Sequence, residues 1–191
     1  LAVKPEKEKM RVIEAFDGSL LTKELILKHG GRMPLTPDTG ADLLKIVVKD
    51  RYGDRPPALG FIKGFGLASG AFAGSVSHDS HNIICIGTND DDIANAVNRV
   101  ISMRGGLAVS NGSFLDSMSL PVAGIMSDDT AENTASAYER LSSAVRSMGC
   151  SMSAPFMTLS FMALLVIPEL KLSDRGLFNG NIFSHVPLFC D

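Results

Sequence analysis

The sequence is poor in several residue types that mark particular functional classes. Its 191 residues include no Trp, two Tyr and three Cys. The formal net charge is -3 at pH 7, so there is no broad basic field to attract a phosphate backbone. The scarcity of Trp and Tyr also leaves few large rings for stacking on nucleic-acid bases. We therefore expect no nucleic-acid binding.

Cysteine usage and the apolar segments bear on the cellular compartment. Cys85, Cys150 and Cys190 are an odd number without CxxC spacing, which argues against a disulfide framework and a thiolate zinc site. This usage fits a reducing cytoplasm. The longest apolar stretch, residues 156–167, is interrupted by polar residues and is shorter than the ~20 residues that span a bilayer. The sequence predicts a cytoplasmic chain that does not contact the membrane.

Composition predicts one globular domain over residues 1–191. The sequence is 45% hydrophobic and 20% charged, which is ordinary for a domain with one substantial core. The N-terminal segment lacks the apolar region of a signal peptide and begins at Leu1 without an initiator Met. We interpret the chain as a fragment in which residues 1–10 form a linker.

Short apolar runs with turn dipeptides between them predict a sheet built from hairpins. Residues 11–28 read as two strands around Asp17-Gly18, and residues 107–118 as a second hairpin around Asn111-Gly112. A loop is expected at residues 30–40. Further strands are expected at residues 43–48, 59–64, 70–77 and 83–88.

Three helices are predicted from their start and stop signals. Asn89 and the carboxylates that follow it begin the first, which ends at Gly105-Gly106. The second is expected between Ser127 and Gly149. The third begins at Pro155 and is closed by Pro168.

The C-terminal tail, residues 169–191, is expected to be irregular, with a short edge strand near His185. The predicted strands and helices do not alternate in regular βαβ units. They therefore predict an α+β fold, in which a mixed and largely antiparallel sheet built from hairpins packs against about three helices.

The densest polar cluster is HDSHN, residues 78–82. His78 and His81 would face opposite sides of a regular strand, so they converge only if the chain bends there, and Asp, Ser and Asn favour such a bend. Three interpretations remain open. Spacing favours a hydrogen-bonded strand entry over a catalytic or substrate-contacting loop, for which histidine is suited by its proton exchange near neutral pH. A self-contained metal site is the third, although no HExxH motif or cysteine pair supplies further ligands.

Four segments resemble the C-terminal domain of microbial adenine deaminases in the amidohydrolase superfamily. They are GFIKGFGL, SVSHDSHNIICIGTNDDDIANAVNRVI, LPVAGIMSDDTAE and PFMTLSFMALLVIPELKLSDRGL, and the resemblance extends over residues 11–189. It implies that the full enzyme hydrolyses adenine to hypoxanthine and ammonia in purine salvage and adenine catabolism. It also implies a (β/α)₈ barrel in which Mn²⁺ or Fe²⁺ activates a water.

The barrel implied by the resemblance is missing from this chain. The sequence has no His-x-His pair, and 191 residues are too few for such a barrel together with this domain. The resemblance thus makes residues 1–10 a linker from a missing metal-binding barrel. It also implies that the metal is bound by that barrel, that this chain binds none, and that the fragment alone is inactive.

The resemblance assigns roles to the HDSHN cluster, which would complete or cover the active site of the barrel. His78, Asp79 and His81 are predicted to be catalytic, and Ser80 and Asn82 to bind the substrate. One segment departs from the family pattern. YGDRPP stands where a histidine-containing segment is expected.

The expected partners are the N-terminal amidohydrolase barrel of the same protein, adenine as substrate, and further copies in a homo-oligomer. Two other functional classes remain open. The chain could be a non-catalytic oligomerisation module, or a module that binds a nucleobase without chemistry.

Overall fold

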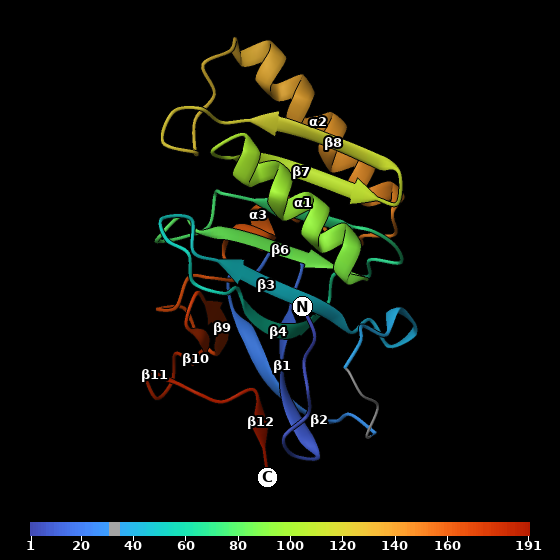
Figure 1. Ribbon diagram of the computed structural model, residues 1–191, viewed down its shortest axis with the longest axis vertical. Coiled ribbons are helices and arrows are strands. Elements are labelled where there is room, and N and C mark those ends of the chain that lie inside the picture. Colours follow the sequence, from blue (N-terminus) through green and yellow to red (C-terminus); the bar gives the residue numbers. More distant parts are fainter. Residues whose placement is uncertain (31–34) are drawn as a thin grey trace.

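The computed structural model describes residues 1–30 and 35–191, which form a large sheet, a small sheet and three α-helices (Figure 1). The large sheet contains β1 (Lys9–Ala15), β2 (Thr22–Lys28), β3 (Leu44–Lys49), β4 (Ala58–Lys63), β5 (Ala71–Gly74), β6 (Ile83–Gly87), β7 (Gly106–Asn111), β8 (Phe114–Ser119) and β12 (Phe189–Cys190). The small sheet contains β9 (Leu170–Ser173), β10 (Gly176–Asn179) and β11 (Ser184–His185). The helices are α1 (Asp90–Ser102), α2 (Ala131–Ser147) and α3 (Pro155–Ser160), with a short 3₁₀ helix, η1 (Thr39–Ala41).

The order of the large sheet is β12-β1-β4-β3-β6-β5-β7-β8, and β2 also pairs with β1. Its pairings are antiparallel except for the short parallel contact between β1 and β4, where Ile13 lies opposite Ile62. The small sheet is antiparallel throughout. The predicted α+β fold with a mixed, largely antiparallel sheet is therefore confirmed.

The central strands are buried on both faces because helices cover both sides of the sheet. On β6, Ile84 and Ile86 belong to the larger core, whereas Ile83 and Cys85 belong to a second core on the opposite face. The apolar face of α1 closes the second core, while α2, α3 and the small sheet close the larger one (Figure 1). This two-sided burial explains the continuous apolar run of β6.

Both predicted hairpins are confirmed. β1 pairs with β2 across Asp17-Gly18, and β7 pairs with β8 across Asn111-Gly112. The predicted start of α1 is also confirmed, because the Asn89 side chain accepts a hydrogen bond from the Asp92 amide at 2.8 Å. The predicted strands at 43–48, 59–64 and 83–88 correspond to β3, β4 and β6.

The third helix is shorter than predicted, because α3 ends at Ser160 and not at Pro168. The chain continues in single turns, and the carbonyl of Met162 accepts a hydrogen bond from the amide of Leu172 at 3.1 Å. This hydrogen bond from β9 occupies a carbonyl that would accept a hydrogen bond within the helix if α3 were longer. Helix propensity is weaker than such a tertiary contact.

The tail is more regular than predicted. Residues 170–179 form the hairpin β9–β10, with Gly176 at a φ of +115° where the second strand begins. Such a φ favours glycine, so the segment LKLSDRGLFN carried a turn signal that the prediction missed. The expected edge strand near His185 is confirmed as β11.

Two further boundaries differ from the prediction. β5 covers only Ala71–Gly74 of the expected strand at 70–77, because the chain turns away toward the HDSHN cluster. Helix α2 begins after Thr130, whose side chain caps it, and not at Ser127. The predicted loop at 30–40 lies partly outside the described residues, and its last part contains η1.

The residues before β1 also pack against the fold. Val3 is buried and forms a bridge with Leu35, so contacts with the rest of the structure begin before β1. Among the described residues, every helix is too short or too polar to cross a bilayer.

Candidate functional site

The HDSHN cluster forms the connection between β5 and β6, at the end of the sheet where β3 also ends. The amide of His81 donates to the carbonyl of Ser77 at 2.7 Å, and His81 has a φ of +50°. The chain therefore bends, and the rings of His78 and His81 come together with a centroid distance of 5.6 Å. This is the convergence that a regular strand would forbid.

His78 is half-buried and fixed by contacts with the end of α3. Its ring stacks on Phe161 at a centroid distance of 4.7 Å and an interplanar angle of 26°. Its amide donates to the carbonyl of Ser160 at 3.0 Å. Ring stacking and the backbone hydrogen bond together restrict the orientation of the imidazole.

His81 is also half-buried, and its environment disfavours the protonated form. Burial lowers the pKa of His81, the charges of His78 and Arg51 lower it further, and Asp79 acts in the opposite direction. Its Nδ1 is buried without a hydrogen-bond partner among the described residues. A neutral imidazole can accept a proton at an accessible ring nitrogen, and with Nδ1 buried the candidate here is Nε2.

The other three residues of the cluster differ in exposure. Asp79 and Ser80 are exposed, whereas Asn82 is buried and its side-chain oxygen accepts a hydrogen bond from the Arg51 amide at 3.1 Å. A cavity of about 340 Å³ lies beside them, on the face of the sheet that carries the small sheet. Its lining includes Asp79, Ser80, Asn82, Val166, Phe178 and Phe183.

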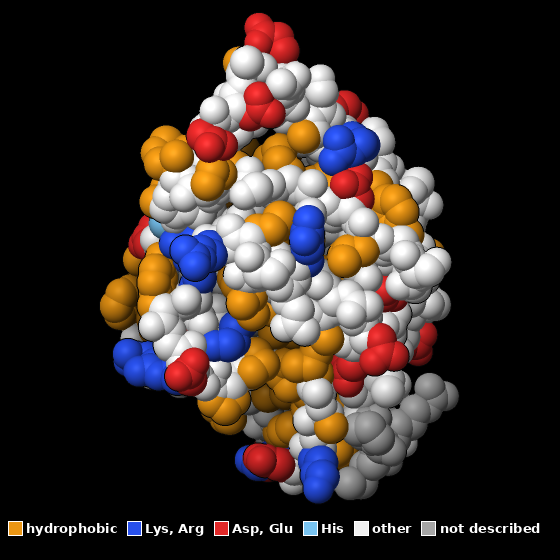
Figure 2. All heavy atoms as spheres, turned by 45° about the horizontal axis from the view of Figure 1, so that its top comes forward, with side chains coloured by type: hydrophobic (Ala, Val, Ile, Leu, Met, Phe, Trp, Pro, Cys, Tyr) orange, Lys and Arg blue, Asp and Glu red, His pale blue; other side chains and the backbone are white. Residues whose placement is uncertain are grey.

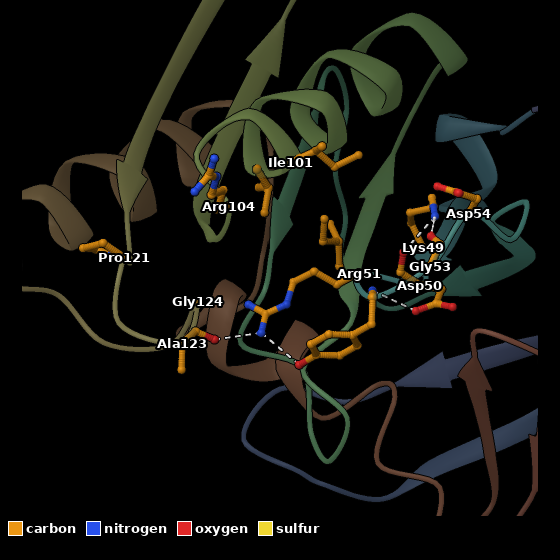
Figure 3. Close-up of a pocket in the computed structure, with 13 residues that line it drawn as sticks. Lys49, Asp50, Arg51, Gly53, Asp54, Ile101, Arg104, Pro121, Ala123 and Gly124 are labelled. Atoms are coloured by element: carbon orange, nitrogen blue, oxygen red, sulfur yellow. Dashed lines mark hydrogen bonds between the residues drawn. The ribbon is translucent and has the colours of Figure 1, made fainter.

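A larger cavity of about 690 Å³ lies on the other side of the cluster, on the α1 face (Figure 3). Arg51 is at its centre, where one terminal nitrogen, Nη2, donates to the carbonyl of Ala123 at 2.7 Å and to the Tyr52 hydroxyl at 2.8 Å. Arg51 was not among the predicted site residues. The only signal was its position one residue after Asp50, beyond the end of the buried strand β3.

The donor set of the described residues does not fit a resident metal. No group of three His, Cys, Asp or Glu side chains lies close enough together in this part of the chain to hold an ion. His78 and His81 provide two rings, whereas protein metal sites of this chemistry use three or more ligands.

The face that carries the HDSHN turn and the loop of residues 50–57 has both hydrophobic and basic side chains. In Figure 1 the loop of residues 50–57 and the HDSHN turn lie on the left of the molecule. Figure 2 shows hydrophobic and basic side chains gathered along this left margin, where a histidine side chain is also visible. Val166, Ile182 and Phe183 are among the exposed apolar residues of the described chain.

Comparison with known proteins identifies the relatives of this chain. Residues 19–184 match the family described as adenine deaminase C-terminal domain. An adenine deaminase from Methanosarcina mazei is 50% identical over 185 residues, which are 96% of this chain and 33% of the relative. An adenine deaminase from Parabacteroides distasonis is 47% identical over 190 residues, 99% of this chain and 35% of the relative. The chain thus spans about a third of the length of the curated relatives it matches.

Proposed function

Because this chain belongs to the adenine deaminase C-terminal domain family, we propose that it is one part of an enzyme that hydrolyses adenine to hypoxanthine and ammonia. The remainder of such an enzyme would supply a barrel whose Mn²⁺ or Fe²⁺ activates the attacking water. The observation that carries this proposal is the polar turn of residues 78–82, which brings two histidines together at an open end of the sheet.

The residues of the turn have chemistry that suits a purine. The exposed carboxylate of Asp79 can accept a hydrogen bond from the exocyclic amine of adenine, and the Ser80 hydroxyl and Asn82 amide can bond ring nitrogens. The aromatic rings of Phe178 and Phe183 offer apolar walls in the same cavity. In this arrangement the base lies in the cavity of about 340 Å³.

The two histidines take different roles in the proposal. His81, whose pKa is lowered by burial and by the charges of His78 and Arg51, accepts a proton from the attacking water and passes it to the amino group that leaves as ammonia. Because its Nδ1 is buried, this role falls to Nε2. His78 is held against Phe161 and orients its neighbour. No step on the metal is assigned to this chain, because its described side chains do not fit one.

The first experiment compares this chain alone with this chain mixed with the separately expressed N-terminal region of the protein. Adenine deamination is measured with Mn²⁺ or Fe²⁺ added. We expect activity only in the mixture, because the turn provides polar groups but not a metal site. Activity of the chain alone would contradict the division of roles, and equal activity of the N-terminal region with and without this chain would contradict its participation.

The second experiment replaces the histidines in the full-length protein. We expect His81→Ala to lower kcat on the order of 100-fold, as the loss of a general acid or base does. We expect His78→Ala to lower kcat as well, because His81 then loses the ring that orients it. His29→Ala is the matched control, because His29 lies after β2 and outside the turn, and its activity is expected to stay near wild type. Near-normal turnover of both turn variants, with unchanged thermal unfolding, would refute the assigned roles.

The nucleobase-binding alternative is favoured by the same cavity and its two phenylalanine rings. It predicts that this chain binds adenine but leaves the activity of the N-terminal region unchanged. The mixing experiment therefore separates the two functions.

A further inference from the structure

The cavity on the α1 face has walls from three parts of the fold (Figure 3). One wall is the loop after β3, residues 49–54, and a second is the end of α1 with Ile101 and Arg104. The third is the loop with Ala123 and Gly124. Its volume of about 690 Å³ is in the range of small-molecule sites, and Ile83, Val100 and Ile101 give it an apolar floor.

The two arginines of this cavity lack carboxylate partners. Arg51 and Arg104 form no ion pair with any described residue. Most other described arginines do, namely Arg11, Arg55, Arg140 and Arg146. The guanidinium of Arg51 donates to neutral oxygens through Nη2 and lies over the Tyr52 ring, with its central carbon 4.9 Å from the ring centroid. Its Nη1 is buried against Gly124 without a hydrogen-bond partner among the described residues. A partly buried guanidinium is unfavourable unless some group compensates its charge.

The acidic residues of the cavity lie away from Arg104. In Figure 3, Asp54 lies beside Lys49 at one end, with Asp50 next to it, while Arg104 lies at the other end and Arg51 reaches toward Gly124 between them. The ammonium of Lys49 donates to the carbonyls of Asp50 and Gly53, at 2.8 Å and 2.6 Å, which holds this loop closed. Both carboxylates of the lining therefore lie at the end with Lys49, and the end with Arg104 has none.

We propose that this cavity binds a small molecule with an oxyanion, such as a phosphate group, between Arg51 and Arg104. Guanidinium groups match the geometry and charge of phosphate oxygens. The cavity is much larger than a free phosphate needs, and its apolar floor can hold an organic portion such as a nucleoside. The ligand class is therefore a phosphorylated small molecule, with the free oxyanion as its minimal form.

The site is connected to the HDSHN turn through Arg51. The Arg51 amide holds the Asn82 side chain, and its charge acts on His81 together with those of His78 and Asp79. An anion at Arg51 would offset the guanidinium charge and so favour protonated His81. By reciprocity, protonation of His81 would strengthen anion binding. Any effect on turnover rests on the proposed function, whereas binding and the titration of His81 do not.

Isothermal titration calorimetry on this chain tests the site with three probes: sulfate, adenosine monophosphate and adenosine. Sulfate is useful because its charge is constant near neutral pH. We expect sulfate and the nucleotide to bind, and Arg104→Met to weaken both by about 10-fold or more through loss of a charge-assisted contact. Arg146→Met is the matched control, because it removes the same charge from α2, and it is expected to change nothing.

The calorimetric outcomes decide the proposal. Arg104 is exposed and its side chain makes no hydrogen bond to a described residue, so its replacement is expected to leave the fold intact, which circular dichroism checks. Binding of sulfate alone would assign the site to a free oxyanion, and tighter binding of the nucleotide would assign it to a phosphorylated nucleoside. Absence of sulfate and nucleotide binding, equal affinity for adenosine and its monophosphate, or equal effects of Arg104→Met and Arg146→Met would overturn the proposal.

The coupling between anion binding at Arg51 and the protonation of His81 is tested by a separate measurement. Nuclear magnetic resonance follows the titration of the His81 ring with and without saturating sulfate. We expect sulfate to raise the pKa of His81 and to bind more tightly at lower pH. Sulfate binding with an unchanged His81 titration would refute the connection while leaving the site itself intact.

Discussion

His81 and Asp92 are both partly or wholly buried, yet their surroundings act differently on ionisation. His81 lies beside a positive guanidinium and has no hydrogen-bond partner at Nδ1 in the described structure, so burial works against its charged form. Burial also tends to raise the pKa of Asp92, but hydrogen bonds from Asn89, Ser110 and Gly112 outweigh it and the pKa is lowered. Hydrogen-bond and charged partners, more than the degree of burial, decide whether the charged form of a buried side chain is favoured.

The lowered pKa of His81 predicts a pH dependence of stability. Because the unfolded chain binds this proton more readily, the contribution of His81 to the free energy of unfolding falls as pH drops through the unfolded-state value of about 6.5. His81→Gln removes this contribution, so the variant is expected to lose less stability than wild type on acidification. Urea unfolding at several pH values measures the difference. Parallel curves for the two proteins would contradict a lowered pKa.

Asp92 is expected to matter for stability in the same direction as His81 but in a more acidic pH range. Its carboxylate joins the start of α1 to the β7–β8 turn, through Ser110 and Gly112 at 2.8 Å each. Since its pKa is lowered in the fold, this stabilisation is present above the unfolded-state value and is lost as pH falls. Asp92→Ala is expected to lower the free energy of unfolding by about 3 kcal/mol at neutral pH.

The matched control for Asp92 is its exposed neighbour Asp91, in the same first turn of α1. Asp91→Ala loses only an interaction with the helix dipole, so we expect a change below about 1 kcal/mol. Denaturant unfolding compares the two variants. Equal losses would show that the hydrogen bonds of Asp92 are not what stabilises this corner of the fold.

Among the elements, the short parallel contact between β1 and β4 depends on an unusually close backbone approach. Gly64 follows β4 with a φ of +103°, and a Cβ atom placed there would lie 2.1 Å from the carbonyl oxygen of Ala15. The Asp42 carboxylate accepts hydrogen bonds from the amides of Gly64 and Gly66, at 2.6 Å and 2.8 Å. Glycine at this position lets the first hairpin join the rest of the sheet.

This packing predicts different effects for two Gly→Ala replacements. Gly18 also has a positive φ, +69°, but an added Cβ would meet nothing within 4 Å. Gly18→Ala is expected to destabilise the fold by about 1 kcal/mol through backbone strain alone. Gly64→Ala is expected to destabilise it by at least about 2 kcal/mol more, because the strand must also move. Thermal unfolding of the pair tests this, and similar melting temperatures would rule out the steric account.

On the scale of the whole molecule, the HDSHN turn separates two cavities on opposite faces of one sheet end. Asn82 lines the smaller cavity, and the next residue, Ile83, lines the larger one. Ile182 and Phe183 lie at the smaller-cavity side of the molecule with exposures of 65% and 71%. We expect the N-terminal region of the proposed enzyme to pack against this apolar margin.

The packing surface predicts an assembly effect. We expect Ile182→Ser to raise the concentration of this chain needed for half-maximal activity in the mixing experiment by about 10-fold, because a large exposed aliphatic side chain that becomes buried contributes about 1.5–3 kcal/mol. Leu115→Ser is the control. It removes an aliphatic side chain of 50% exposure from β8, at the other edge of the sheet. Indistinguishable concentration curves for the two variants would place the interface elsewhere.

Local signals in the sequence determined much of this protein. Asp17-Gly18 and Asn111-Gly112 fixed two hairpins, Asn89 fixed the start of α1, and the run of residues 83–88 predicted a fully buried strand. These features depend on residues within a few positions of one another. The family resemblance was also visible in the sequence and is confirmed. The roles assigned to the HDSHN cluster stay a prediction.

Only the tertiary structure decided the rest, because it depends on groups far apart in the chain. The shortening of α3 depends on a hydrogen bond from β9, and the place of Arg51 beside Asn82 depends on β3 and β6 being neighbours. The convergence of His78 and His81 required a bend that the spacing permitted but did not dictate. Propensity and periodicity act locally, whereas pairing and packing bring together residues whose separation in sequence carries no signal.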